Sequence, residues 1–188
     1  MGKISKAIWF IITQTVFKFT FGHIGKKTLI NRPLQIDNGK GIYLESGVYI
    51  SQYAWLMGSK KKKSLWIKSG TAIGHFSHII SKESVVIEEN VLIADKVFIS
   101  DCTHRYDDIE SPVMYQEVDA LSPVIVGKDS WIGENVCIYG ASIGKHCVIG
   151  ANSVVKNDIP DYCVAVGCPA KVVKQYDFQS KKWIKVQQ

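Results

Sequence analysis

Aliphatic side chains recur at every sixth position of this chain in five runs of three residues. The runs are Leu44, Ile50 and Leu56; Ile67, Ile73 and Ile79; Ile87, Ile93 and Ile99; Val126, Ile132 and Ile138; and Ile143, Ile149 and Val155. Four positions after the first two members of each run lies a small or β-branched residue: Val48, Ala54, Thr71, Ser77, Val91, Val97, Ser130, Val136, Cys147 and Ser153. An amphipathic helix would need apolar residues every three to four positions. The spacing of six therefore predicts an all-β solenoid with three very short strands in each coil.

The chain is expected to form one domain, because 188 residues suffice for a single core but not for two large ones. We expect residues 1–30 to form an N-terminal helical or capping segment, residues 31–160 the β-helix, and residues 161–188 a C-terminal tail with a capping helix. Glycine follows the aliphatic residue at several corners, for example at Gly74 and Gly133. We expect these glycines to supply the backbone freedom that a corner needs.

The longest break in the repeat lies between Ile99 and Val126, and it predicts a loop over residues 101–123 that is extruded from the solenoid. Loops of this length in compact domains usually carry function. The loop begins within the sequence SDCTHRYDD, at residues 100–108. A shorter break carries the lysine-rich stretch SKKKKS, which is either a solvated charge run or a contact for anionic lipid or glycan.

The repeats and the loop motif together resemble the hexapeptide-repeat acyltransferases, especially the O-antigen and capsule O-acetyltransferases and the galactoside and maltose acetyltransferases. Members of the O-antigen group commonly read Ser-Asp-His-x-His where this chain reads Ser100-Asp101-Cys102-Thr103-His104. The resemblance covers about residue 30 to residue 188. It implies a left-handed parallel β-helix, a homotrimer with active sites between subunits, and acetyl-CoA as acyl donor. It also implies that His104 is the catalytic base and that Cys102 replaces the first histidine of the motif.

A histidine in this loop suits acyl transfer to a hydroxyl group. A sugar hydroxyl is a weak nucleophile at neutral pH, and an imidazole can remove its proton as the oxygen attacks a thioester carbonyl. We expect Asp101 to hold the second ring nitrogen of His104. The same loop supplies the expected acceptor contacts, at Arg105, Tyr106 and Asp107. Cys102 offers an alternative mechanism through a covalent acetyl-cysteine, although direct transfer in the family favours a packed role for this side chain.

The same resemblance assigns the acyl donor to the C-terminal coils. In the sugar acetyltransferases, a Trp-Ile-Gly coil and a Gly-Ala-x-Ser coil line the cleft for the pantetheine arm, and basic residues near a Gly-x-Pro-Ala-Lys motif contact the nucleotide phosphates. The matching residues here are Trp131, Gly133, Glu134, Ala151, Asn152, Lys156, Lys171 and Lys174. Backbone groups at Glu134 and Ala151 are the expected partners of the arm, and an amide in this region could stabilise the oxyanion of the tetrahedral intermediate. Lysine supplies charge to the phosphates without the bidentate geometry of arginine.

Charge and cysteine content bear on partners and compartment. The net charge is +6, and the sequence contains no nucleic-acid motif, so we expect no nucleic-acid partner. The five cysteines are scattered without C-x-x-C pairs, which indicates a reduced, cytoplasmic chain without a zinc site. The N-terminal sequence MGKISKAIWFIITQTVFKFTFG has an apolar run shorter than the ~20 residues of a transmembrane helix. It is either a helix packed on the body or an interfacial helix at the inner face of the cytoplasmic membrane.

These observations predict an acetyl-CoA-dependent O-acetyltransferase. The expected acceptor is a sugar hydroxyl of a bacterial surface glycan (O-antigen, capsule or exopolysaccharide) or of its lipid-linked precursor. The alternatives are an N-acetyltransferase of an amino sugar nucleotide or antibiotic, a non-catalytic β-helix assembly module, and a zinc enzyme like the carbonic anhydrases of this fold. That zinc site needs three histidines that converge on one point. His75 and His78 are three residues apart in a six-residue repeat, so their side chains should point from different faces or corners of the coil, and we expect no metal.

Overall fold

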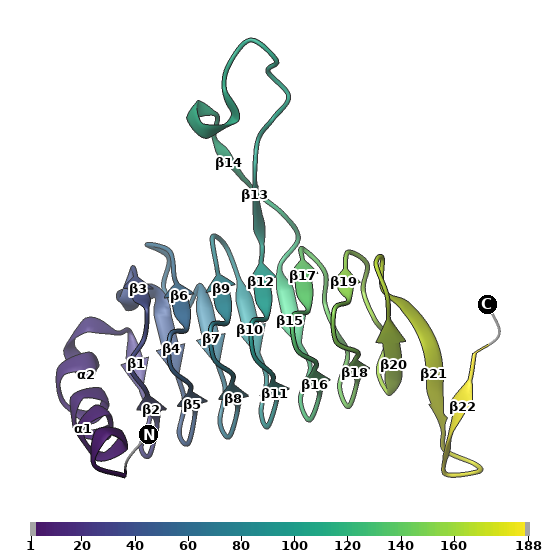
Figure 1. The fold of residues 1–188 in the computed structure, drawn as a ribbon, viewed down its shortest axis with the longest axis horizontal. Coiled ribbons are helices and arrows are strands. Elements are labelled where there is room, and N and C mark those ends of the chain that lie inside the picture. Colours follow the sequence, from purple (N-terminus) through teal and green to yellow (C-terminus); the bar gives the residue numbers. More distant parts are fainter. Residues whose placement is uncertain (1–2, 187–188) are drawn as a thin grey trace.

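The computed structural model describes residues 3–186 and shows a three-sided solenoid with helices at its N-terminal end (Figure 1). The two α-helices of the described chain are α1 (Lys3–Gln14) and α2 (Val16–Thr20), and the 3-10 turns are η1 (Gly39–Gly41) and η2 (Val113–Tyr115). Each coil passes in turn through three parallel sheets, called here the first, second and third sheets. The chain is therefore a stack of coils along one axis, as the repeat predicts.

The sheets take their strands at regular intervals along the chain. The first sheet contains β1 (His23–Ile24), β4 (Ile42–Leu44), β7 (Leu65–Ile67), β10 (Val85–Ile87) and β15 (Val124–Val126). The second contains β2 (Leu29–Ile30), β5 (Tyr49–Ile50), β8 (Ala72–Ile73), β11 (Leu92–Ile93), β16 (Trp131–Ile132), β18 (Val148–Ile149), β20 (Cys163–Val166), β21 (Lys171–Asp177) and β22 (Lys182–Lys185). The third contains β3 (Gln35–Asp37), β6 (Trp55–Met57), β9 (His78–Ile80), β12 (Phe98–Ser100), β17 (Cys137–Tyr139) and β19 (Val154–Val155). A separate hairpin is formed by β13 (Cys102–His104) and β14 (Val118–Ala120).

The six-residue runs form the buried core of the solenoid. In the second sheet, Ile73, Ile93, Ile132 and Ile149 pair in register from coil to coil. Each of these side chains is at most 1% exposed. Full burial of such a side chain is worth about 1.5–3 kcal/mol. The aliphatic residues of the repeat therefore point inward and form the core of the predicted solenoid.

The structure contains one coil before the five runs of the repeat. Strands β1, β2 and β3 place Ile24, Ile30 and Ile36 at the same spacing of six, and the first two are buried. The solenoid therefore begins at His23, inside the segment 1–30 that the sequence assigned to the N-terminal cap. The helices of the described part of that cap are α1 and α2.

The small residues at the corners tie successive coils together. The Ser130 hydroxyl donates to the carbonyl of Gly144 at 3.0 Å and accepts the amide of Cys147 at 2.9 Å. Thr71 and Ser77 make equivalent pairs of bonds to the next coil. Serine and threonine can therefore replace valine at these buried positions because their hydroxyls are hydrogen-bonded.

The glycines that follow the aliphatic residues have a different role from the one expected. Gly74 and Gly133 do not have positive φ angles, whereas Asn90 and Asn135 at neighbouring corners do, at 56° and 59°. A Cβ atom on Gly74 would lie 2.4 Å from backbone atoms of Ala94 in the next coil. Glycine is required because adjacent coils approach closely, and asparagine tolerates the left-handed corner.

The C-terminal segment is not the capping helix that the sequence predicted. Instead, β21 pairs antiparallel with β20, and β22 pairs antiparallel with β21, which extends the second sheet. Val172 packs on the buried core, and the Ala170 amide donates to the Val154 carbonyl at 2.8 Å. The last parallel strand has an open edge whose main-chain groups need partners, and another strand supplies them where a helix would not.

Candidate active site

Strands β13 and β14 form the base of the extruded hairpin (Figure 1), and His104 is the last residue of β13. The hairpin leaves the corner between the third and first sheets, and His104 on β13 stands opposite Val118 on β14. The His104 side chain is exposed. Toward the tip, Ile109 and Tyr115 are 91% and 76% exposed. The break in the repeat therefore carries a histidine to an accessible corner and presents apolar side chains beyond it.

Asp101 does not serve His104 in the way that the sequence predicted. Its carboxylate is fully buried and accepts hydrogen bonds from the backbone amides of Lys82, Glu83 and Ser84 at 2.6–2.8 Å. These amides belong to the preceding coil, at the turn between β9 and β10. Asp101 therefore fixes the corner from which the hairpin emerges and has a structural role.

The three residues expected to contact the acceptor differ in availability. Arg105 makes a bidentate pair with Asp119, with Nε–Oδ2 and Nη2–Oδ1 distances of 3.1 and 2.7 Å. This pair raises the pKa of Arg105 and lowers the pKa of Asp119. Arg105 thus braces the two strands of the hairpin. Tyr106 is 71% exposed, and Asp107 is exposed beside it.

The thiol of Cys102 is half-buried beside Ser100. The Sγ atom lies 3.4 Å from the Ser100 hydroxyl oxygen, which also accepts the Cys102 amide at 3.1 Å. Successive side chains of a β-strand point to opposite faces, so Cys102 and His104 lie on the same face of β13. Both residues line the same cavity. The structure thus places the thiol in the wall of this cavity.

This cavity, with a volume of about 450 Å³, lies on the outer surface of the third sheet, next to the hairpin. It is lined by Trp55, Met57, His78, Ile80, Phe98, Ser100, Cys102, Thr103, His104, Val118 and Tyr139. The sequence analysis missed the aromatic residues of this wall. Three of them directly precede a core aliphatic residue, as in Trp55-Leu56, His78-Ile79 and Phe98-Ile99, so an outward strand position was the available signal.

The residues expected to hold the pantetheine arm gather at the corner between the second and third sheets. Glu134, Asn135, Ala151 and Asn152 line a cavity of about 400 Å³ together with Lys96. Lys96 pairs with the Glu134 carboxylate at 3.0 Å. The Glu134 carbonyl already accepts the Asn152 amide at 2.9 Å. Glu134 is one of the two residues whose backbone groups are expected to bind the arm, and its carbonyl is therefore engaged between coils.

Trp131 and Gly133 lie on the coil that leads to this corner. The Trp131 side chain is 50% exposed on the outer face of the second sheet. A Cβ atom on Gly133 would lie 2.7 Å from the Ala151 amide nitrogen, so the glycine lets the two cleft-forming coils approach.

The expected phosphate contacts are near one another in the fold. Lys171 and Lys174 are exposed on β21. Between these two residues, the register of the pairing of β21 with β20 shifts at a β-bulge or irregularity. The amide of Ala170, the neighbour of Lys171, donates a hydrogen bond to the carbonyl of Val154. Val154 lies two residues before Lys156, which is exposed. The three ammonium groups thus belong to the C-terminal end of the solenoid, beyond the coil of Trp131.

Within one chain, the histidine and the cofactor residues occupy different corners. His104 follows β12 at the corner of the third and first sheets, whereas Glu134 follows β16 at the corner of the second and third sheets. The third sheet separates them. A single copy therefore does not bring the two halves of the expected site together.

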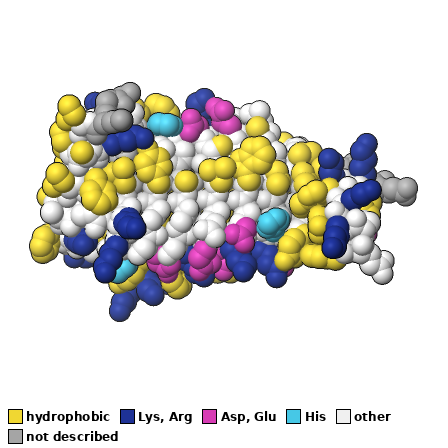
Figure 2. Space-filling view, turned by 90° about the horizontal axis from the view of Figure 1, so that it is seen from below, with side chains coloured by type: hydrophobic (Ala, Val, Ile, Leu, Met, Phe, Trp, Pro, Cys, Tyr) yellow, Lys and Arg dark blue, Asp and Glu magenta, His cyan; other side chains and the backbone are white. Residues whose placement is uncertain are grey.

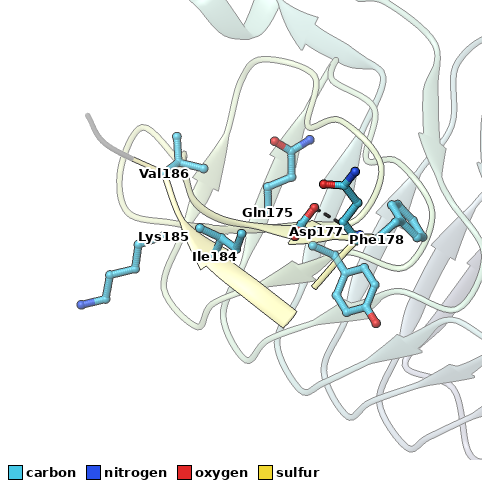
Figure 3. A pocket seen from close by; sticks show the side chains of 8 residues that line it. Gln175, Asp177, Phe178, Ile184, Lys185 and Val186 are labelled. Atoms are coloured by element: carbon cyan, nitrogen blue, oxygen red, sulfur yellow. Dashed lines mark hydrogen bonds between the residues drawn. The ribbon is translucent and has the colours of Figure 1, made fainter. Parts of the chain in front are cut away.

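Another cavity, of about 500 Å³, lies in the C-terminal hairpin (Figure 3). Figure 3 shows Gln175, Asp177 and Phe178 on one strand and its turn, with Ile184 and Lys185 on the other strand. No catalytic, donor-binding or acceptor-binding residue expected from the sequence lines this cavity.

The histidine pair H-x-x-H does not converge on a common point. His75 Nδ1 lies 3.1 Å from Asp95 Oδ1 at a corner, whereas His78 stacks on Trp55 in the third sheet. Among residues 3–186, no group of three or more His, Cys, Asp or Glu side chains could hold a metal ion.

A parallel solenoid with a six-residue repeat and a histidine-bearing hairpin defines a hexapeptide-repeat protein. Residues 123–157 match the family model described as the hexapeptide repeat of succinyl-transferase. The chain is 32% identical over 161 residues to YJL218W of Saccharomyces cerevisiae, named as an acetyltransferase, which covers 85% of this chain and 69% of that protein. The chain belongs to the hexapeptide-repeat acetyltransferase family.

Bacterial relatives match shorter parts of the chain. WbbJ of Escherichia coli K12, whose name refers to a lipopolysaccharide biosynthesis O-acetyl transferase, is 39% identical over 128 residues, which cover 64% of this chain and 65% of WbbJ. The acetyltransferase-named Rv3034c of Mycobacterium tuberculosis is 50% identical over 78 residues, which cover 41% of this chain and 26% of that protein. The chain thus spans just under two thirds of the first relative and about a quarter of the second.

Solved structures share the fold at low sequence identity. The N-acyltransferase AntD of Bacillus cereus, in complex with dTDP and 3-hydroxybutyryl-CoA, aligns with a TM-score of 0.74 at 22% identity over 89% of this chain and 90% of AntD. The acetyltransferase VCA0836 of Vibrio cholerae, complexed with acetyl coenzyme A, aligns with a TM-score of 0.64 at 22% identity over 93% and 82% of the two chains. In the described part of this chain, no helix has the length and hydrophobicity to span a bilayer.

Proposed function

We propose that the protein transfers the acetyl group of acetyl-CoA to a sugar hydroxyl of a bacterial surface glycan or of its lipid-linked precursor. His104 takes the hydroxyl proton as the oxygen attacks the thioester carbon. When the carbon–sulfur bond of the tetrahedral intermediate breaks, the same ring returns a proton to the coenzyme A sulfur. Acetyl ester and free coenzyme A are the products, and the base is restored without a covalent acyl-enzyme.

The observation that carries this proposal is the position of His104 in the wall of the third-sheet cavity. A general base must come within hydrogen-bond reach of the proton that it removes. The cavity is mainly apolar, so a hydroxyl bound there would be shielded from competing water. Family membership and the similarity to WbbJ support acetyl-CoA as donor and a glycan as acceptor.

The test is the release of free thiol from acetyl-CoA with panels of hydroxyl sugars and amino sugars. We expect turnover with a hydroxyl acceptor to fall by about 10²-fold or more in His104→Ala, because the general base is lost. His146→Ala is a matched control, since His146 packs on Tyr162 at a different corner. Full activity of His104→Ala with a hydroxyl acceptor would contradict the assigned role.

Transfer to an amine is the second candidate function, and the fold similarity to the N-acyltransferase AntD favours it. An uncharged amine is a stronger nucleophile than a hydroxyl and needs less help from a base. Amino sugars would then be the productive acceptors, and His104→Ala would cost less activity than it does with a hydroxyl.

We propose that the active sites lie between subunits of a homotrimer. The outward positions of the second sheet form an apolar row, with Leu92 and Trp131 52% and 50% exposed (Figure 2). The row consists of Leu29, Tyr49, Ala72, Leu92, Trp131, Val148 and Val164, which pair in register. A partner subunit would cover this face and could set its His104 corner against the donor corner of this chain.

Subunit complementation tests this arrangement. His104→Ala and Trp131→Ala proteins are each expected to be impaired, and co-refolded mixtures should regain activity because some interfaces combine an intact His104 with an intact Trp131. Sedimentation analysis should give three copies per particle. Mixtures that stay as inactive as their parents, although mixed assemblies form, would contradict shared sites.

We also propose that the N-terminal helices touch the inner face of the cytoplasmic membrane. Ile4, Ile8 and Ile11 share the outer face of α1 and are 79%, 51% and 60% exposed. Residues 1–40 contain seven of the 23 basic and one of the 17 acidic residues, so their formal charge of +6 equals that of the whole chain. An exposed apolar helix face surrounded by excess positive charge suits an anionic lipid surface.

Co-sedimentation with vesicles tests the membrane contact. We expect wild type to bind phosphatidylglycerol-containing vesicles more than phosphatidylcholine vesicles, and the double variant Ile8→Glu, Ile11→Glu to lose this binding. Phe178→Glu is the control, because Phe178 is 62% exposed and follows β21, which lies at the opposite end of the solenoid (Figure 1). Equal binding by wild type and the double variant would exclude the helix as the contact.

A further inference from the structure

The lysine-rich loop at residues 59–64 leaves the same edge of the solenoid as the extruded hairpin (Figure 1). This loop joins β6 to β7, the turn at residues 81–84 joins β9 to β10, and the hairpin follows β12 and leads to β15. In each case the chain passes from the third sheet to the first sheet. The loop, the turn and the hairpin are therefore neighbours on successive coils.

The lysine-rich loop is closed by hydrogen bonds, unlike a simple solvated charge run. The Ser64 side chain is fully buried, and its hydroxyl oxygen accepts the Ser59 amide at 2.8 Å. Within the loop, the Lys61 amide donates to the Ser59 hydroxyl at 3.2 Å. The Lys63 ammonium lies 4.2 Å from the centroid of the Trp66 ring. These contacts hold four like charges close together, which an anionic ligand would stabilise.

The four lysines differ in their partners. Lys61 forms an ion pair with Glu83, and Lys63 lies over an aromatic ring. Among the described residues, no carboxylate pairs with Lys60 or Lys62. Both of these side chains are exposed, so their charges are available to a ligand.

Lys60 lines a cavity of about 370 Å³ between the loop and the base of the hairpin. A second lysine, Lys82, lines it too, beside the polar residues Asn38 and Ser59. Among the described residues of the lining there is no aspartate or glutamate. Lys82 donates one hydrogen bond to the Val118 carbonyl, and an ammonium group has three donors. The cavity thus presents two ammonium groups that can donate to a ligand.

The acidic residues that adjoin this lining in sequence have partners of their own. They are Asp37, Glu83, Asp101 and Asp119. Glu83 and Asp119 form ion pairs with Lys61 and Arg105. Asp37 accepts the indole N–H of Trp55, and Asp101 accepts three backbone amides. None of the four lines the cavity or pairs with its two lysines, so the cavity suits an anion.

This cavity is adjacent to the one that contains His104. The two cavities share Met57, Ile80, Cys102 and Val118 in their linings. Among the described residues around the His104 cavity, there is no lysine, arginine, aspartate or glutamate. A ligand that extends across both cavities would therefore place uncharged groups near His104 and anionic groups near the two lysines.

A sugar that is joined to its carrier through a diphosphate has this division, because an uncharged ring is followed directly by two phosphoryl groups. We infer that Lys60 and Lys82 form a binding site for the diphosphate that links the acceptor to its carrier. A lysine ammonium binds phosphate as a point charge. This inference rests on the proposed function and deepens it, because the substrate is then a precursor that still carries its diphosphate and not the finished polymer.

Calorimetric titration with inorganic pyrophosphate tests the site without acetyl transfer. Excess coenzyme A is present, so that pyrophosphate does not report on the lysines expected to bind the donor. Lys60→Gln and Lys82→Gln each remove one charge from the cavity. Lys62→Gln is the matched control, because it removes the same charge from the same loop, although Lys62 does not line the cavity.

We expect pyrophosphate to bind wild type, and each cavity variant to bind it about 5- to 10-fold more weakly. This loss lies between the value of an exposed ion pair and that of a hydrogen bond to a charged group. Lys62→Gln should bind within about twofold of wild type. Lys82→Gln also removes the bond to Val118, so Lys60→Gln decides the matter if that variant misfolds.

Two further measurements separate a linking diphosphate from the phosphate of lipid head groups. With acetyl-CoA, Lys60→Gln should raise KM for hexoses joined through diphosphate to a short alkyl chain, and leave KM for the matching methyl hexosides unchanged. The same variant should co-sediment with phosphatidylglycerol vesicles as wild type does, because the membrane contact is proposed for the N-terminal helices.

The inference is overturned if pyrophosphate does not bind wild type, if Lys60→Gln binds it unchanged, or if Lys62→Gln causes the same loss. Loss of vesicle binding by Lys60→Gln, with KM unchanged for the diphosphate-linked hexoses, would assign the lysine to lipid head groups and would also overturn it. Pyrophosphate binding that depends on Lys60, without acetyl transfer to any hydroxyl, would uphold the site and refute the proposed function alone.

Discussion

Replacing Asp101 with alanine separates a structural role for this residue from a catalytic one. The buried carboxylate accepts three backbone amides at 2.6–2.8 Å, from Lys82, Glu83 and Ser84. A hydrogen bond to a charged group contributes about 1.5–3 kcal/mol. The donors lie in a half-buried turn, so water will satisfy part of what the substitution leaves unpaired. We therefore expect Asp101→Ala to lower the free energy of unfolding by about 3–4 kcal/mol, less than the sum of three bonds.

Urea unfolding followed by circular dichroism measures this effect. With an m-value of about 2–3 kcal/mol/M, the midpoint should fall by at least about 1 M. Protein concentration must be the same for all variants, because association of the proposed subunits would contribute to apparent stability. Asp158→Ala is the matched control, since the exposed Asp158 accepts one amide, that of Ser142, at 2.7 Å. That control should cost no more than about 1 kcal/mol.

The opposite result would refute the structural reasoning. If Asp101→Ala unfolded within about 0.5 kcal/mol of wild type while acetyl transfer fell about as far as in His104→Ala, the carboxylate would be acting on the histidine. Asp101→Asn sharpens the comparison. Its single oxygen can keep some of the amide bonds, so its loss of stability should lie between those of wild type and the alanine variant.

Three further outcomes follow from the fold. Gly74→Ala should lower the free energy of unfolding in urea by about 1–3 kcal/mol, because the alanine Cβ would lie 2.4 Å from the Ala94 backbone. A variant as stable as wild type would show that the coils can separate freely at this corner. Arg105→Lys should change the free energy of unfolding by less than about 1 kcal/mol, because the ion pair of Arg105 with Asp119 is exposed. The same substitution should speed proteolytic cleavage of the hairpin. An unchanged cleavage rate would mean that the ion pair does not brace the hairpin. Burial lowers the pKa of His78 in the folded chain, so as the pH falls below 6.5 the unfolded chain binds a proton first and the free energy of unfolding should decrease. The urea midpoint measured against pH should show this decrease, and His78→Phe should flatten it. An unaltered profile would assign the effect to other groups.

The sequence predicted the coils well because each coil repeats the same local requirement. An inward aliphatic residue such as Ile93 must recur at the same place in every turn of the backbone, and a small residue must occupy the buried corner. The run Ile24, Ile30 and Ile36 satisfies the same rule and could have been found in the same way. The place of His104 could also be predicted, because it lies at the start of the longest break in the repeat.

The partners of individual side chains were less accessible. Asp101 lies only three residues before His104 in the sequence, yet its carboxylate faces amides of the preceding coil. The C-terminal lysines are arranged along β21 because the open edge of β20 required a strand. In both cases, main-chain groups that needed hydrogen-bond partners determined the outcome, and no periodic pattern records that need.

The amino-acid sequence by itself determined the six-residue solenoid, its inward core and the place where a histidine-bearing loop interrupts it, because these features depend on residues a few positions apart. Only the tertiary structure decided which outward residues meet. Trp55, His78 and Phe98 form one wall beside His104 because strand pairing across coils aligns them, while outward positions tolerate almost any residue. The spacing that specifies the core therefore leaves the outward residues unspecified, and the stacking of coils brings them together around a cavity.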